Sequence, residues 1–181
     1  MAKVDVYNTN NKYQIIYADP PWKYGRTGNK KWKPAKHYYP TLKPKEVGEL
    51  LKPIFNNIAD DNCLLFMWVV SPELDKIIQM TESLGFDYIT IAFVWHKMRA
   101  NVGNYTMPGC EICLLFKKGK IPSDRVRNPG TKQFLEERST THSTKPKEIA
   151  NRIKRMFPKS KAIELFARDE KEGWDCWGNE V

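Results

Sequence analysis

The chain has 181 residues, with 30 Lys and Arg against 21 Asp and Glu, which gives a formal charge of +9 at pH 7. This length suits one domain over residues 1–181, and a composition that is 41% hydrophobic and 12% aromatic argues against disorder. The longest apolar run, Cys63 to Val70, is too short to cross a membrane. The start of the chain has no apolar signal region, and four cysteines make no disulfide scaffold, so we expect an intracellular protein without a membrane partner.

Short apolar, β-branched or aromatic runs alternate with helical patterns along the chain. Strands are predicted at 14–18, 63–70, 88–95, 110–116 and 162–167, and helices at 44–59, from an N-cap at Ser71 to Gly85, and at 146–157 after a cap at Thr144. Pro53 is expected to kink or divide the first helix. This alternation predicts an α/β fold with a mostly parallel central sheet and helices on both faces.

Three long segments fit neither pattern, namely residues 23–41, 98–109 and 117–138. The first is rich in lysine, including Lys30, Lys31 and Lys33, and it interleaves aromatic residues such as Tyr39 without any acidic residue. Cations that meet phosphates and rings that stack on bases suit a nucleic-acid strand, so all three segments are predicted to contact nucleic acid. A solvated basic surface without a partner is the alternative.

Two predicted strands run into unusual polar sequences. Residues 15–18 lead into Asp19-Pro20-Pro21-Trp22, and residues 163–167 lead into Arg168. If these strands are parallel neighbours, their carboxyl ends share a crevice where ligands bind in open α/β sheets.

The Asp-Pro-Pro-Trp segment offers a carboxylate, carbonyl oxygens and an indole ring on a stiff frame, because two prolines restrict the turn and provide no N–H donors. These acceptors suit a planar ligand with an exocyclic amine, such as adenine. Hydrogen bonds from the amine N–H groups to Asp19 and to the Pro20 carbonyl would strengthen as positive charge develops on the nitrogen during methylation. A turn that merely ends a strand is the alternative.

The chain resembles the adenine 6-amino methyltransferases that include the messenger-RNA adenosine methyltransferase catalytic subunit and many phage and bacterial DNA adenine methylases. The resemblance rests on segments that span nearly the whole chain, namely 19–22, 38–41, 65–69, Glu111, 144–146, 164–168, 173–174 and 177–180. It implies a Rossmann-like methyltransferase fold in the beta-type motif order, with S-adenosylmethionine as the cofactor.

The resemblance also implies site roles. Asp19, Pro20, Pro21 and Trp22 would form the catalytic turn, and Trp22 and Tyr39 would line the base pocket. The composition of the basic segment, rather than the resemblance, predicts that Lys30, Lys31 and Lys33 bind the nucleic acid. The cofactor would contact Asp5, Asp19, Lys145, Glu164, Arg168, Asn179 and Glu180, with Lys145 on its carboxylate. The chain lacks room for a separate target-recognition domain, so sequence choice would come from the basic loops or from another subunit, either a second copy or a partner.

We therefore expect methylation of the adenine 6-amino group in nucleic acid, with DNA favoured over RNA for a compact basic domain. The alternatives are an RNA adenine methyltransferase, a catalytically silent nucleic-acid-binding subunit, and a methyltransferase for small amines. Cys110 and Cys113 have the spacing of zinc ligands but lack a second pair, so no metal is expected and both are predicted to be core residues.

Overall fold

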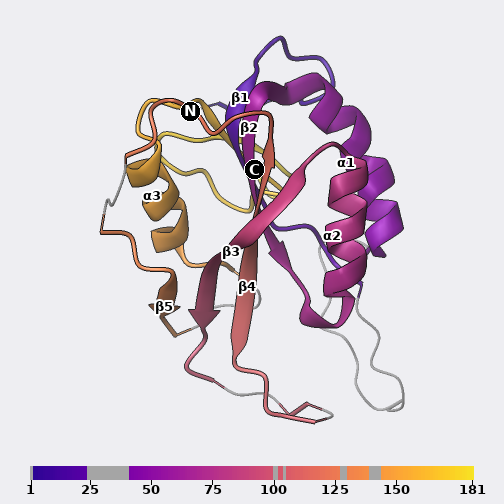
Figure 1. The fold of residues 1–181 in the computed structure, drawn as a ribbon, viewed down its shortest axis with the longest axis vertical. Helices are drawn as coiled ribbons and strands as arrows, with labels where there is room; N and C mark the ends of the chain where they lie inside the picture. Colours follow the sequence, from indigo (N-terminus) through magenta and orange to yellow (C-terminus); the bar gives the residue numbers. More distant parts are fainter. Residues whose placement is uncertain (1, 24–40, 100–101, 104, 127–129, 139–143) are drawn as a thin grey trace.

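The computed structural model describes residues 2–23, 41–99, 102–103, 105–126, 130–138 and 144–181. A seven-stranded sheet in the order β5-β3-β4-β2-β1-β6-β7 forms its centre (Figure 1). The strands are β1 (Tyr13–Ala18), β2 (Ala59–Val69), β3 (Asp87–His96), β4 (Cys110–Lys118), β5 (Phe134–Glu136), β6 (Ala162–Leu165) and β7 (Asp175–Trp177). The helices are α1 (Pro44–Ile58), the 3₁₀ turn η1 (Ser71–Glu73), α2 (Leu74–Ser83) and α3 (Lys147–Met156).

The sheet is mostly parallel, as predicted. β1 pairs in parallel with β2 and β6, β6 with β7, and β3 with β5, whereas β4 runs antiparallel to both β2 and β3. β4 begins at the same edge of the sheet at which β3 ends, because His96 pairs with Cys110, so the two strands run in opposite directions. The carboxyl ends of the six other strands therefore share one edge with the amino end of β4.

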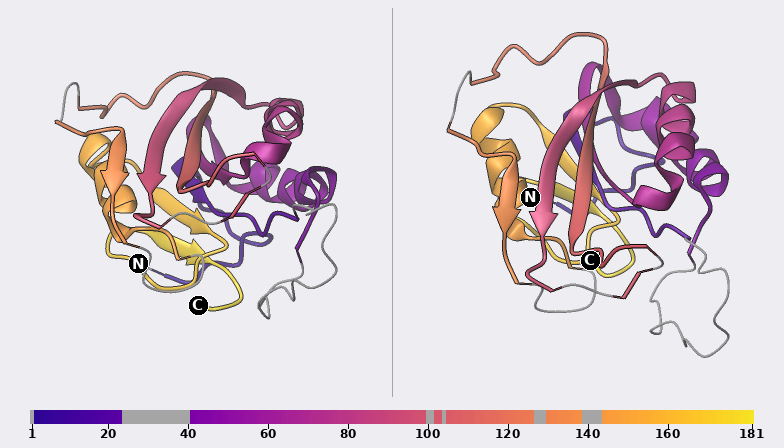
Figure 2. Two further views of the ribbon diagram at one scale, coloured as in Figure 1. Left: turned by 90° about the horizontal axis from the view of Figure 1, so that it is seen from below. Right: turned by 60° about the horizontal axis from the view of Figure 1, so that its bottom comes forward.

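Helices cover both faces of this sheet (Figures 1 and 2). On one face, α1 and α2 contribute Leu51, Phe55 and Ile77 to a core that also contains Ile16, Leu65 and other inward residues of the sheet. On the other face, α3 packs over a second core rich in aromatic side chains. Because both faces are buried, β1, β2 and β6 read as nearly continuous apolar runs, which explains why their positions were predictable.

Three details of the helices differ from the prediction. Pro53 neither ends nor divides α1, and it lies on the exposed side of the helix. Ser71 is not an N-cap but the first residue of η1, which precedes α2. The N-cap of α3 is Pro146 rather than Thr144. Among the described residues, no helix is both long enough and apolar enough to span a membrane.

Candidate active site at the carboxyl edge of the sheet

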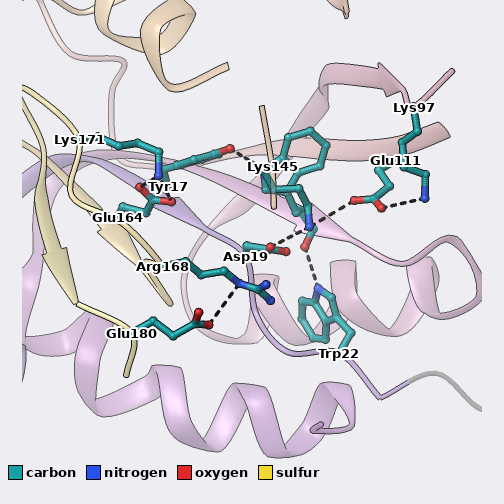
Figure 3. Close-up of polar contacts among 11 residues, drawn as sticks. Tyr17, Asp19, Trp22, Lys97, Glu111, Lys145, Glu164, Arg168, Lys171 and Glu180 are labelled. Carbon is teal, nitrogen blue, oxygen red and sulfur yellow. Dashed lines mark hydrogen bonds and ion pairs between the residues drawn. The ribbon is translucent and has the colours of Figure 1, made fainter. Parts of the chain in front are cut away.

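The Asp-Pro-Pro-Trp turn and the Arg168 segment meet at one edge of the sheet, as predicted. β1 and β6 are parallel neighbours, and Ala18 pairs with Leu165, so Asp19 and the residues before Arg168 leave the sheet side by side. β7 lies next to β6 and carries Asn179 and Glu180 to the same edge. Figure 3 shows Arg168 lying between Asp19 and Glu180.

The antiparallel strand β4 adds a carboxylate to this edge. Glu111 is its second residue and pairs with Trp95 near the end of β3, while Lys97 follows β3 directly. Sequence reasoning gave Glu111 only through the family resemblance, because the direction of β4 was needed to bring it beside Asp19.

Two lysines and two carboxylates form a continuous chain of opposite charges here (Figure 3). The Lys145 ammonium lies 2.7 Å from an Asp19 oxygen and 3.2 Å from a Glu111 oxygen. The other Glu111 oxygen lies 3.0 Å from the Lys97 ammonium. Lys145 is the central member, with its side chain 11% exposed against 21% for Asp19.

The two carboxylates in this row of charges respond differently to burial and to the nearby lysines. Burial raises the pKa of the Asp19 carboxyl above its ordinary value, and the Lys145 ammonium offsets only part of that rise. Burial acts on Glu111 in the same direction, but Lys145 and Lys97 together outweigh it and lower the pKa of that carboxyl. Burial would also lower the pKa of Lys145, yet Asp19 and Glu111 raise it, so this ammonium stays charged.

The prolines place the turn's carbonyls as acceptors, but these carbonyls are less free than predicted. The Pro20 carbonyl accepts the N–H of Trp22 at 2.8 Å, and the Pro21 carbonyl accepts the N–H of Leu42 at 2.8 Å. A carbonyl oxygen has two lone pairs, so Pro20 keeps one for a ligand. Trp22 and Leu42, which flank segment 24–40 in the sequence, form an isolated parallel bridge beside the turn.

Trp22 was predicted to line the base pocket, but its side chain is largely buried. Its side chain belongs to the core, with the residue only 6% exposed, and its indole N–H donates to the Trp68 carbonyl at 2.8 Å. In this conformation Trp22 anchors the turn to β2.

A close backbone approach positions the end of the chain over β6. A Cβ atom on Gly178 would lie 2.2 Å from the Ala167 carbonyl oxygen, so only glycine fits there. The neighbouring Ala167 N–H donates to the Trp177 carbonyl at 3.0 Å. Arg168 and Glu180 then face each other at 3.5 Å. Nothing in the sequence pattern indicated that Phe166, just before them, has a left-handed backbone with φ 61°.

Two predicted cofactor residues have other partners or lie at the rim. Glu164 is buried, and both of its oxygens accept hydrogen bonds from Lys171, at 2.7 and 3.0 Å. Its contact with the cofactor stays a prediction. Asp5 is exposed and accepts hydrogen bonds from Tyr7 and Asn8, in a segment that pairs with β7 through the Val4 N–H. Its cofactor contact stays a prediction.

The predicted nucleic-acid segments divide into three cases. Lys30, Lys31, Lys33 and Tyr39 lie outside the described residues. β3 ends and β4 begins at the site edge, which is where segment 98–109 leaves and rejoins the sheet. Residues 119–126 lie at the opposite edge, where Asp124 accepts the N–H groups of Lys159 and Ser160 after α3. Contact of either segment with nucleic acid stays a prediction.

The paired cysteines also separate. Cys113 is buried in the core under α3, whereas Cys110 is exposed, so the prediction of a core position is right for the first and wrong for the second. Among the described residues, no group of three or more His, Cys, Asp or Glu side chains is arranged to hold a metal ion.

Comparison with known proteins places this site in a family context. A family model described as MT-A70 matches residues 13–180. The chain is 44% identical over 187 residues to the Type II methyltransferase M.MunI of Mycoplasma sp, covering 94% of this chain and 78% of that protein. It is 27% identical to the human N(6)-adenine-specific methyltransferase METTL4, in an alignment that covers 96% of this chain and 38% of METTL4. It is 28% identical to the human N(6)-adenosine-methyltransferase catalytic subunit METTL3, in an alignment that covers 94% of this chain and 28% of METTL3.

Proposed function

The chain belongs to the MT-A70 family, and we propose that it transfers a methyl group from S-adenosylmethionine to the 6-amino nitrogen of adenine in DNA. The observation that carries this proposal is the position of Asp19. Its carboxylate and the Pro20 carbonyl lie on a stiff turn at the carboxyl edge of the sheet, beside the cationic and acidic groups of Lys145, Arg168 and Glu180.

The donor set at this edge fits the cofactor's functional groups. Lys145, two residues before α3, can pair with a carboxylate near a helix N-terminus, where anions are favoured. The Glu180 carboxylate can accept hydrogen bonds from ribose hydroxyls, next to Arg168 and Asn179. S-adenosylmethionine supplies a methyl carbon bound to a positively charged sulfur, which makes that carbon electrophilic.

The chain's own residues prepare the amine for this methyl group. The lone pair of an aromatic amine is delocalised into its ring, so the nitrogen is a poor nucleophile. Acceptance of its two hydrogens by Asp19 and the Pro20 carbonyl favours a pyramidal nitrogen and stabilises the positive charge that develops on it. As the N–C bond forms and the C–S bond electrons pass to sulfur, the nitrogen must lose a proton. The Asp19 carboxylate, whose pKa is raised by burial, can accept that proton.

The Lys145 ammonium donates a hydrogen bond to one Asp19 oxygen. A carboxylate on the cofactor would compete for the same ammonium and would free this oxygen for the amine. Glu111, which contacts Lys145 from the other side, keeps the ammonium at the site in either arrangement.

We favour DNA over RNA because the chain is more similar to the Type II methyltransferase M.MunI than to METTL4 or METTL3. It spans most of M.MunI but less than two fifths of METTL4 and METTL3. The test is incubation of DNA and RNA with the protein and labelled S-adenosylmethionine, followed by digestion and mass spectrometry of the nucleosides. We expect labelled N6-methyldeoxyadenosine. Label confined to adenosine would favour an RNA enzyme. No label, together with no S-adenosylmethionine binding by calorimetry, would favour a catalytically silent subunit.

A further inference from the structure

Trp68 lies where three parts of the candidate site meet. In β2, Met67 pairs with Ala18, the last residue of β1, so Trp68 is the next residue along and lies level with Asp19. The residue is 1% exposed and belongs to the aromatic core beneath α3. The chemistry described above does not use Trp68, yet this residue contacts both Trp22 of the catalytic turn and Lys145.

Each part of Trp68 has a separate partner. Its backbone carbonyl accepts the Trp22 indole N–H at 2.8 Å, which anchors the catalytic turn. Its own indole N–H donates to the Tyr17 hydroxyl at 2.7 Å. The face of its ring lies 5.5 Å from the Lys145 ammonium, measured to the ring centroid. Only the last two contacts depend on the side chain.

The ring contact matters because a lysine stem is flexible. The Lys145 ammonium must hold a position within reach of two carboxylates, and a four-carbon stem does not fix that position by itself. The negative face of an indole attracts a buried ammonium and restricts where it can lie. The indole is held in turn by its bond to Tyr17 and by the edge-on packing of Trp95, with ring centroids 6.4 Å apart.

We propose that Trp68 is a positioning residue for methyl transfer, whose indole face keeps the Lys145 ammonium within reach of Asp19, Glu111 and the cofactor's carboxylate. The inference rests on the function proposed above. Trp68 touches neither the substrate nor the reacting atoms in this scheme. It acts through Lys145, and through Lys145 on the Asp19 carboxylate and on the cofactor's carboxylate.

The placement can be tested without cofactor or nucleic acid. In protein labelled at lysine Cε, the Lys145 signal is identified by its loss in Lys145→Met, and ring currents are expected to shift its protons upfield. Trp68→Leu should abolish that shift, and Trp68→Phe, which keeps a smaller ring, should reduce it. Phe66→Leu is the matched control, because Phe66 lies on the same strand and face, is equally buried, and packs on Phe93 and Phe157 instead. An unchanged Lys145 shift in both Trp68 variants would overturn the proposal.

The kinetic consequence separates positioning from simple stability. Trp68→Phe should raise the KM for S-adenosylmethionine and lower kcat, with a combined loss in kcat/KM of about tenfold, the order expected for a buried cation–aromatic contact. Phe66→Leu should lower the thermal midpoint without changing either constant of the folded enzyme. Equal kinetic constants in wild type and Trp68→Phe would contradict the positioning role. If the wild-type protein transfers no methyl group, the proposed function fails, while the lysine signal still decides whether Trp68 places Lys145.

Discussion

The position of Asp19 at the site disfavours the ionised form of its carboxyl group. Burial raises the pKa of this carboxyl despite the nearby Lys145 ammonium, so the ionised form is less stable in the folded chain than in the unfolded one. The favourable contribution of the protonated form is complete below the ordinary Asp value and is lost as pH rises through the raised pKa. At neutral pH the wild-type protein therefore carries the cost of the ionised group.

The neutral variant Asp19→Asn is accordingly expected to match or exceed the wild-type thermal midpoint at pH 7, because it does not ionise. The difference should shrink as pH falls through the raised Asp19 pKa, where the wild-type carboxyl takes up its proton. Thermal unfolding by circular dichroism at pH 7 and at a series of lower pH values measures this. A variant less stable than wild type at pH 7 would show that Lys145 more than compensates for burial.

The pH dependence of methyl transfer should reflect the same group. Asp19 must be ionised to accept the amine hydrogen and proton, so kcat/KM should fall on acidification with an apparent pKa above the ordinary 3.8. Lys145→Met should move this acid limb to higher pH, because the ammonium lowers the Asp19 pKa. Lys97→Met should move it less, because Lys97 contacts Glu111 and not Asp19. A limb that moves to lower pH in Lys145→Met would contradict the assignment.

At the scale of elements, the end of β7 depends on one glycine. Gly178→Ala would place a methyl group against the Ala167 backbone, which cannot move without disturbing β6. We expect a loss of about 1–3 kcal/mol in the free energy of unfolding and a weaker affinity for S-adenosylmethionine. Gly48→Ala is the control, because its Cβ would meet only side-chain atoms of Met80, with Cγ at 2.8 Å, and no backbone atom. Denaturant unfolding and calorimetry of both variants measure the effect, and equal small losses would show that the close approach at Gly178 is unimportant.

The long elements were predictable from sequence because burial on both faces leaves a clear apolar pattern. α1 and α3 were predicted to within about a turn, and β1 to β4 within a few residues. β5 and β7 were missed, since three-residue strands exist only through pairing with β3 and β6. The site predicted from the sequence was also incomplete, because some of its contacts depend on how the strands pair. The Asp-Pro-Pro-Trp pattern supplied Asp19 and the family resemblance supplied Lys145, but only the antiparallel course of β4 and the register beside β1 show how Glu111 and Trp68 meet Lys145.

Across the whole molecule, the net charge of +9 should appear in the salt dependence of nucleic-acid binding. If Lys30, Lys31 and Lys33 each neutralise a phosphate of duplex DNA, replacing all three by alanine should reduce the slope of log affinity against log salt by about 2 to 3. Replacing Lys118, Lys120 and Lys159, which lie at the edge opposite Asp19, should leave the slope unchanged. Titration at several salt concentrations measures both slopes. A change only in the second variant would place the nucleic-acid surface on the opposite edge.

The central claim is that the Asp19 carboxylate accepts the hydrogens of the target amine while a methyl group is transferred to its nitrogen. The most direct measurement is the single-turnover rate of N6-methyldeoxyadenosine formation by wild-type protein and by Asp19→Asn, both saturated with cofactor and DNA. We expect the variant to bind both ligands and to lose at least about a thousandfold in rate, the scale of a lost transition-state acceptor. A variant that keeps more than about a tenth of the wild-type rate would contradict the account, since removal of an essential acceptor costs far more than that.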